Sequence, residues 1–271
     1  MDNHFMKLKF VFLFLVGVSA CSFQIVESRQ LKENPPAQIL SSNSKQTVLV
    51  ELFTSEGCSS CPPADRALAF LQKEQPNSAA EIITLAFHVD YWNNLGWKDE
   101  FSSPLFTQRQ QFYARKFRLD SAYTPQMVID GSYEFIGSNL GKAQKSISEA
   151  AKLAKAKIKL EKNEAELKVK ISEIPPNNEA TVYLAIAEDN LVSDVKRGEN
   201  SGNKLEHISV VRELKILGKI APNSQSFEIE QSIKLDERWK KENLKLVVFI
   251  QENKNRQILG SQFLLFSKDT N

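Results

Sequence analysis

Short apolar runs, separated by polar turns and a helical pattern, dominate the first part of the folded sequence. Continuous apolar and β-branched residues at 47–53 and again at 81–89 are typical of buried strands. Between these runs, apolar residues recur at helical spacing after Pro62, a residue type that is tolerated in the first turn of a helix. The pattern predicts a strand, a helix that begins at about Pro62, and a second strand.

A longer helix, a hairpin and a third helix are expected next. Ser103 followed by Pro104 is typical of a capped helix start, and apolar positions at helical spacing continue to about Phe117. Asp130-Gly131 lies between two short apolar runs and predicts a β-hairpin. The Ala- and Lys-rich stretch 139–156 has the apolar spacing of an amphipathic helix.

Beyond residue 157 the apolar spacing changes from helical to alternating, which is the pattern of half-buried strands. Strands are expected at 158–160, 167–171, 181–187, 227–233, 244–252 and 258–266. Because no helical stretch interrupts them, these strands favour an antiparallel sandwich over a continuation of the first sheet. The sequence therefore predicts a small all-β, sandwich-like domain after the first domain.

The N-terminal segment has the features of an export signal. Lys7 and Lys9 precede the apolar run 10–18, and small residues follow it. A run this short does not reach across a bilayer, for which a helix needs about 20 residues. Residues 18–21 resemble a bacterial lipobox, which implies that Cys21 carries a lipid and is the first residue of the mature chain. The alternative is an ordinary signal peptide followed by an unrelated cysteine.

These signals divide the chain into four parts. Residues 1–20 are expected to be a lipoprotein signal peptide and residues 21–45 a flexible tether, since the tether is polar and lacks an apolar period. A first domain at 46–156 and a β domain at 157–271 follow. Ser22 after the lipidated cysteine favours, by resemblance to enterobacterial sorting, the outer membrane with the protein facing the periplasm.

Composition narrows the classes of partner. The 271 residues include 42% hydrophobic and 25% charged residues, which is typical of a soluble globular protein. The formal net charge of +2 gives no reason to expect the concentrated basic surface that nucleic acid requires, so nucleic acid is not expected as a partner. Contact with a membrane is expected through the lipid on Cys21.

Two of the three cysteines lie in one motif, Cys58-Ser59-Ser60-Cys61, between a predicted strand and a predicted helix. The positive end of a helix dipole stabilises a thiolate, and two intervening residues let both sulfurs reach bonding distance. In an exported protein such a pair is free to form a disulfide. We expect Cys58, nearer the loop and more exposed, to attack a substrate disulfide and Cys61 to resolve the mixed disulfide.

Other roles for the pair stay open. A purely structural disulfide would stabilise little, because it closes a very small loop. Zinc ordinarily takes four ligands, often two cysteine pairs, and the chain has one such pair. Copper accepts two cysteines and a histidine, which Cys58, Cys61 and His88 could supply. A binding module with a vestigial dithiol is a third hypothesis. The redox interpretation, which requires neither a metal nor a cofactor, is favoured.

The order of strand, cysteine pair, helix, strand, helix, Thr-Pro and hairpin resembles the thioredoxin fold. In that fold a cis proline, preceded by Thr or a similar residue, lies beside the dithiol, and Thr124-Pro125 occupies the matching place. The resemblance implies that Thr124 and Pro125 contact the substrate, with the backbone of Thr124 pairing with an extended chain. It also implies an α/β thioredoxin-like fold for the first domain.

From about residue 47 onward the chain is similar to an uncharacterised family of secreted bacterial thioredoxin-like proteins, a domain of unknown function. The matching segments are 56–65 (EGCSSCPPAD), 88–92 (HVDYW), 96–99 (GWKD), 124–126 (TPQ) and 197–200 (RGEN). This resemblance implies export and a fold but no established reaction.

The cysteine motif departs from that of thioredoxins, and nearby polar residues are candidates to compensate. Pro62-Pro63 directly follows the second cysteine and no Trp precedes the first, so the thiolate should be less stabilised than in a thioredoxin. His88 and Asp90 lie at the end of the second strand, where either is a candidate proton shuttle to Cys61. The alternative for each is a structural hydrogen bond.

A charged loop in the second half is expected to cap the dithiol. Arg197, Glu199 and, soon after, Arg212 carry more charge than a passive connection needs, although a solvated loop is the alternative. An arginine near Cys58 would favour its thiolate. Together these features predict a membrane-tethered thiol–disulfide oxidoreductase that acts on exported proteins or small thiols.

Overall fold

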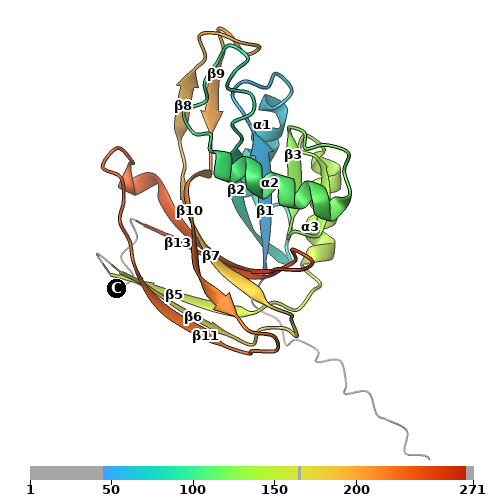
Figure 1. The fold of residues 1–271 in the computed structure, drawn as a ribbon, viewed down its shortest axis with the longest axis vertical. Helices are drawn as coiled ribbons and strands as arrows, with labels where there is room; N and C mark the ends of the chain where they lie inside the picture. The colour runs from blue at the N-terminus through green and yellow to red at the C-terminus, as the bar shows by residue number, and fades with distance from the viewer. Residues whose placement is uncertain (1–44, 164–165, 267–271) are drawn as a thin grey trace, which may run out of the picture. The chain divides into compact units, whose positions relative to one another are not determined.

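Both halves of the chain contribute strands to one eight-stranded sheet in the computed structural model, which describes residues 45–163 and 166–266 (Figure 1). In chain order its strands are β1 (Gln46–Thr54), β2 (Ala80–His88), β3 (Gln126–Ile129), β4 (Tyr133–Ile136), β7 (Ala180–Glu188), β10 (Val210–Ile220), β12 (Leu244–Glu252) and β13 (Ile258–Leu265). In space the order is β13-β12-β7-β10-β2-β1-β3-β4. The sheet is mixed, because β1 pairs in parallel with β2 and antiparallel with β3.

The expected fold class, a helix-flanked thioredoxin-like domain followed by a separate small β domain, is wrong. The strand that overturns it is β10, which pairs antiparallel with β7 and also lies parallel to β2, with Val210 opposite Ala86. Sequence alternation does not predict β10, because register shifts at 211–213 and 216–218 interrupt its pattern. The described residues are therefore mostly β and are built on one large mixed sheet.

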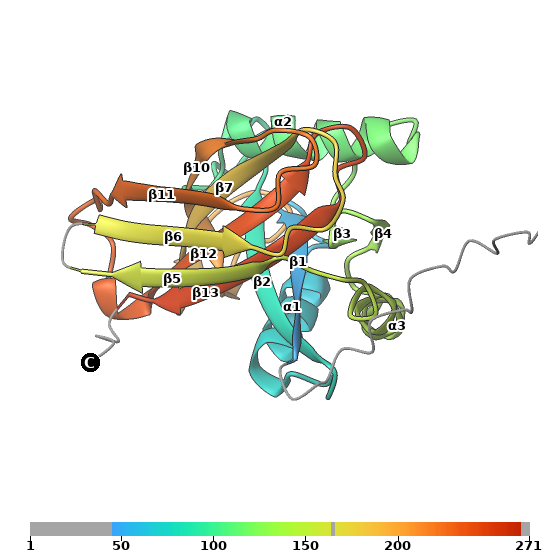
Figure 2. The ribbon, with the colours of Figure 1, turned by 90° about the horizontal axis from the view of Figure 1, so that it is seen from below.

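Two smaller sheets accompany the large one. The first contains β5 (Lys157–Lys162), β6 (Glu166–Ser172) and β11 (Phe227–Ser232), and the second pairs β8 (Leu191–Asp194) with β9 (Lys204–His207). Figure 2, which views the molecule from below, shows β5, β6 and β11 side by side and in front of β7 and β12 of the large sheet. Leu167 and Val169 of this three-stranded sheet share an apolar core with Val182 and Leu246 of the large sheet. The second half of the chain thus forms a local two-layer packing and also extends the first sheet.

The described part of the chain contains three α-helices and one short 3-10 helix: α1 (Pro62–Glu74), α2 (Pro104–Phe117), α3 (Leu140–Ala150) and η1 (Lys241–Asn243). Helices α1 and α3 share an apolar core with one face of β1, through residues such as Leu68 and Ile147. Helix α2 packs on the other face, where Phe106 and Tyr113 contact the core around Phe53. No helix within these described residues is long and apolar enough to cross a membrane.

Local signals determine where α2 begins, and a distant partner determines where the chain goes after α3. The predicted α2 is confirmed at both ends, and Ser103 Oγ accepts a hydrogen bond from the Leu105 N–H at 3.2 Å. Helix α3 ends at Ala150, earlier than the expected residue 156. Beyond it, the buried Nζ of Lys155 lies 2.7 Å from Oδ2 of Asp130, an ion pair that holds the chain against the β3–β4 turn.

Candidate functional site

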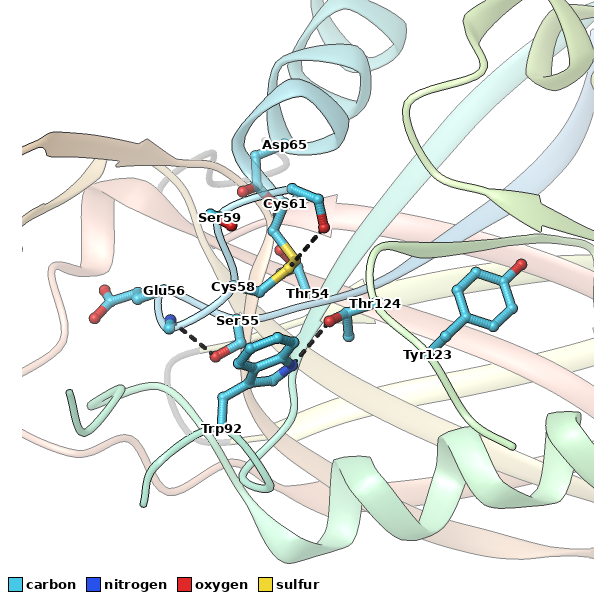
Figure 3. The surroundings of a disulfide bond; sticks show 12 residues. Thr54, Ser55, Glu56, Cys58, Ser59, Cys61, Asp65, Trp92, Tyr123 and Thr124 are labelled. Carbon is cyan, nitrogen blue, oxygen red and sulfur yellow. Dashed lines mark hydrogen bonds between the residues drawn. A yellow bond between two sulfur atoms is a disulfide. The ribbon is translucent and has the colours of Figure 1, made fainter. Parts of the chain in front are cut away.

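A disulfide joins Cys58 and Cys61 between the end of β1 and the start of α1, with the two Cα atoms 5.4 Å apart (Figure 3). Cys61 is the N-cap residue of α1, and its carbonyl accepts hydrogen bonds from the N–H groups of Ala64 and Asp65. Both cysteines are 0% exposed. The expectation that Cys58 is the more exposed of the two is therefore wrong, because both sulfurs are covered in the oxidised form.

The turn that carries the disulfide is held by short-range hydrogen bonds. The Gly57 N–H donates to Ser55 Oγ at 3.1 Å, and the Cys58 N–H donates to the Ser55 carbonyl at 3.2 Å. The hydroxyl of Ser60 lies 3.4 Å from Sγ of Cys58. A hydroxyl in this position is a hydrogen-bond donor for a thiolate at Cys58.

The loop 195–203 between β8 and β9 contacts this turn from far along the sequence. Nδ2 of Asn200 donates to the carbonyls of Glu56, at 2.8 Å, and Cys58, at 3.0 Å. Oε2 of Glu199 accepts from the Ser59 N–H at 3.0 Å, and hydrogen bonds from Ser59 lower the pKa of Glu199. The structure thus brings Glu199, a residue of the predicted cap, to the cysteine motif.

The two arginines of the predicted cap lie elsewhere. Nη1 of Arg212 is 3.6 Å from Oε2 of Glu188, and its guanidinium stacks over the rings of Phe101 and Trp239. Arg197 forms no hydrogen bond or ion pair with any residue in the described ranges. Neither arginine therefore forms an ion pair or hydrogen bond at the cysteine motif in this structure, and Glu199 and Asn200 make its contacts with the loop.

His88 is buried at the end of β2, and its partner is Asp99. Nδ1 of His88 lies 2.7 Å from Oδ2 of Asp99, whose same oxygen also accepts the Glu56 N–H at 2.9 Å. Burial alone would lower the pKa of His88, but the Asp99 carboxylate raises it above its ordinary value. Asp90, the other predicted proton shuttle, instead binds the hydroxyl of Thr107 on α2 at 2.5 Å.

Glu56 and His207 form a second buried pair of an acid and a base, next to His88 and Asp99. Nε2 of His207 lies 3.3 Å from Oε1 of Glu56, and Trp97 donates to Oε2 of Glu56 at 2.6 Å. The imidazole rings of His88 and His207 have centroids 5.1 Å apart. Among the described residues, Oε1 of Glu56 and Nε2 of each histidine have no hydrogen-bond partner. The cluster therefore has proton-binding atoms that remain unsaturated next to the cysteine turn.

Asp65 connects this cluster to the helix that carries Cys61. Its Oδ1 accepts a hydrogen bond from Thr54 Oγ1 at 2.9 Å, across the gap between α1 and the end of β1 (Figure 3). Burial raises the pKa of the Asp65 carboxyl, although the charges of His88 and His207 act in the opposite direction. Part of the residue remains at the surface, but the carboxyl points inward at Thr54. Asp65 thus has the environment of an acid that can hold a proton.

The Thr124-Pro125 peptide is cis and is linked to the cysteine turn by Trp92. Nε1 of Trp92 donates to Thr124 Oγ1 at 2.9 Å, and Figure 3 shows the indole between Thr124 and the turn. A Cβ at Gly57 would lie 3.0 Å from Cβ of Trp92, so the turn packs directly on this side chain. The structure therefore joins the predicted substrate-binding pair and the cysteine motif through one aromatic residue.

Sequence reasoning missed several members of the site. Asp65, Asp99 and Glu56 stood within the matching segments but had no assigned role, and His207 and Asn200 come from the second half of the chain. In the described parts of the chain, no group of three or more His, Cys, Asp or Glu side chains is arranged to hold a metal ion.

The fold and site define a mostly β protein with a large mixed sheet and a CxxC disulfide at the N-terminus of a helix, backed by buried acids and histidines. The chain belongs to the family described as protein of unknown function (DUF1223), which matches residues 49–251. The match confirms the expected membership of an uncharacterised family.

One solved structure supports the fold. The crystal structure of a protein from Agrobacterium tumefaciens is 24% identical, covers 84% of this chain and 97% of its own, and superposes with a TM-score of 0.66. A domain of the outer membrane lipoprotein Omp28 from Porphyromonas gingivalis is 12% identical over 41% of this chain and 88% of its own, with a TM-score of 0.22. No curated protein matches the chain.

Proposed function

We propose that the protein is a thiol–disulfide oxidoreductase whose redox-active group is the Cys58–Cys61 pair. The observation that carries the proposal is the position of this disulfide, which lies at the N-terminus of α1 and above a buried cluster of acids and histidines. A disulfide that closes so short a loop adds little stability, so its value is chemical. Its substrates are thiols or disulfides of exported proteins or of small molecules.

The exchange proceeds through a mixed disulfide. Once the turn opens and exposes Sγ of Cys58, which is buried in the oxidised form, a substrate thiolate attacks this sulfur. The Cys58–Cys61 bond then breaks, and its electron pair leaves on Sγ of Cys61. The second substrate thiolate then attacks the substrate sulfur bound to Cys58, which expels the Cys58 thiolate and releases the oxidised substrate. In total, two electrons and two protons pass from the substrate dithiol to the cysteine pair, and the reverse sequence reduces a substrate disulfide.

Two groups stabilise a thiolate at Cys58. The Ser60 hydroxyl lies 3.4 Å from its sulfur and can donate a hydrogen bond. The N-terminus of α1 adds its positive dipole end, although the two prolines at 62 and 63 remove two of the N–H groups that a helix start normally offers. The Ser60 hydroxyl therefore adds to a helix contribution that the two prolines reduce.

The buried cluster supplies the proton acceptor for Cys61. Asp65 follows Cys61 by one helical turn and has a raised pKa, and its carboxyl interacts electrostatically with His88. His88 in turn is paired with Asp99 at 2.7 Å. We assign Asp65 and His88 to hold and release the proton of the Cys61 thiol, in place of Asp90, whose carboxylate is bound to Thr107.

We further propose that the protein works in the bacterial envelope, anchored through a lipid on Cys21 to the outer membrane. Cys21 lies outside the described residues, and the support is the apolar run and lipobox-like segment that precede it. Mass spectrometry of the mature N-terminus tests the anchor. A thioether-linked lipid on Cys21 is expected, and an unmodified N-terminus at another residue would contradict it.

Catalysis of disulfide exchange by the purified protein tests the redox function. The oxidised protein should accelerate disulfide formation in reduced ribonuclease, or the reduced protein should accelerate the reduction of insulin. Cys58→Ser should abolish either activity, whereas Cys61→Ser should accumulate mixed disulfides with substrates. Ser201→Ala serves as the control, because its hydroxyl donates to the Lys196 carbonyl and not to the cysteine turn. Equal rates for the wild type and Cys58→Ser in both assays would contradict the proposal.

A further inference from the structure

A cavity of about 370 Å³ lies between α2 and the strands β7, β10 and β12. It is on the α2 face of the large sheet, whereas the cysteine pair precedes the helix on the other face. Its walls are apolar and aromatic, and they include Leu105, Phe112, Tyr183, Leu214 and Ile216. The volume falls in the range of sites that bind small molecules.

Apolar side chains at this cavity remain open to solvent. Leu105 is 46% exposed, Phe112 40% and Ile216 63%. They come from α2 and β10, two elements far apart in the sequence, and converge on one opening. Exposed apolar residues that gather at a cavity indicate a surface that gains free energy when it is covered.

The polar atoms at the floor of the cavity already have partners. Arg109 donates to Glu51 at 2.6 Å and to Gln251 at 3.2 Å, and its guanidinium is surrounded by four aromatic rings. The Tyr113 hydroxyl binds Glu51 and accepts from Gln251. A polar ligand would find these groups occupied, whereas a hydrocarbon chain can cover them without breaking a hydrogen bond.

Two arginine side chains lie over the ring of Phe112, which lines the cavity. The guanidinium groups of Arg115 and Arg256 both lie 4.7 Å from the centroid of the Phe112 ring. Within residues 45–163 and 166–266, no carboxylate forms an ion pair with either arginine. Two unpaired cations beside an apolar cavity complement an anionic head attached to a hydrocarbon tail.

We propose that this cavity binds a single-chain anionic amphiphile, with its hydrocarbon tail among Leu105, Phe112 and Ile216 and its anionic head at Arg115 and Arg256. The cavity accommodates the hydrocarbon tail because its walls are apolar and the polar groups at its floor already have hydrogen-bond partners. The anionic head lies at Arg115 and Arg256 because no carboxylate among the described residues forms an ion pair with either of them. The site is separate from the cysteine pair, so Cys58→Ser should bind the amphiphile as the wild type does.

Calorimetric titration with laurate, dodecanol and dodecylammonium tests both halves of the proposal, since the three probes share one tail and differ in charge. Laurate, added below its micelle concentration, should bind saturably at one site. Dodecylammonium should bind at least about tenfold more weakly, because its head faces two like charges. Equal affinity for the three probes, or no saturable binding of laurate, would overturn the proposal.

Variants at exposed positions locate the site. Ile216→Asn and, independently, Leu105→Asn should each weaken laurate binding by at least about fivefold, while Val192→Asn, at a 50% exposed position outside the cavity, should leave it unchanged. Arg256→Gln should weaken binding about fivefold, whereas Arg66→Gln on the exposed side of α1 should not. If both cavity variants bind laurate as tightly as the wild type, the site is not this cavity.

Discussion

Nδ1 of His88 lies 2.7 Å from Oδ2 of Asp99, and both side chains are buried at the end of β2. Each residue shifts the pKa of the other in the direction expected for an ion pair. Although burial opposes the charged form of both, the pKa of His88 is raised and that of Asp99 is lowered. The same aspartate also holds the N–H groups of Glu56 and Phe101, so it organises the chain just before the cysteine turn.

The first prediction concerns the pH dependence of stability. His88, with a raised pKa, stabilises the fold fully below its ordinary pKa of 6.5, and this contribution is lost as the pH rises through the folded value. Asp99, with a lowered pKa, stabilises the fold above its ordinary pKa of 3.8, and this contribution is lost as the pH falls through the folded value. Asp99→Asn should therefore lower the free energy of unfolding most between these two pKa values, by about 3 kcal/mol.

Urea unfolding of the wild type and Asp99→Asn between pH 3 and pH 9 measures this difference. Asp90→Asn is the matched control, since Asp90 is bound to Thr107 and has no contact with His88. The difference in free energy of unfolding between Asp90→Asn and the wild type should not be largest in the pH range between the ordinary pKa values of Asp99 and His88. A pH-independent cost of Asp99→Asn would show that the pair is not ionised.

The second prediction concerns access to the disulfide. Asn200→Ala removes two hydrogen bonds to the backbone of the cysteine turn, each worth about 1 kcal/mol. Opening of the turn should become easier by about 2 kcal/mol, so the disulfide should be reduced up to about thirtyfold faster by dithiothreitol. Ser201→Ala is the control, because its hydroxyl contacts only the Lys196 carbonyl in the same loop. Unchanged reduction in Asn200→Ala would mean that the loop does not limit access.

The third prediction contrasts a buried with an exposed ion pair. Glu51→Gln leaves the charge of Arg109 uncompensated in the core and should lower the free energy of unfolding by about 3–5 kcal/mol. Glu149→Gln removes the partner of Lys152 on the helix surface and should cost less than about 1 kcal/mol. Guanidinium unfolding of both variants provides the comparison. Similar costs would show that Arg109 finds another partner when Glu51 is neutral.

The fourth prediction concerns Lys245, which is buried beside Asp189 and donates to Ser209 Oγ at 2.6 Å. Burial lowers its pKa from 10.5 to about 8. Between these two values the unfolded chain binds more protons than the folded chain, so the Lys245 contribution to stability rises with pH. Lys245→Met should remove this rise from a series of urea unfolding curves at pH 7.5–10.5. A series parallel to that of the wild type would contradict the depressed pKa.

Local sequence signals predicted much of the secondary structure. The Ser103 cap with its following proline determined the start of α2, and Asp130-Gly131 determined the β3–β4 hairpin, whose residues both have positive φ. The spacing of Cys58 and Cys61 likewise favoured a disulfide over a metal site, and the structure contains this disulfide. Each of these features depends on residues within a few positions of one another.

Local sequence patterns did not predict which residues are hydrogen-bond partners within the candidate site. His88 and Asp90 are close in sequence and suggested a shared role, but β2 ends at His88, so the alternation of the strand does not extend to Asp90, whose carboxylate binds Thr107 of α2. Asp99, eleven residues from His88, returns to the His88 face through a loop. Asn200 reaches the Cys58 carbonyl across 142 positions of sequence. The spacing of apolar residues along the chain does not predict contacts between residues so far apart in the sequence.

By itself, the sequence determined the order of most helices and strands, the cysteine motif and the family resemblance, because periodicity, caps and turns act over short distances. Only the tertiary structure decided that both halves share one sheet and that Asp99, Glu56 and His207 surround His88. The reason lies in β10, which pairs with β7 along its length while Val210 also pairs with Ala86 of β2 on the other side. Backbone hydrogen bonds can join any two strands, so the alternation of side chains specifies the buried face of each strand but not its neighbour.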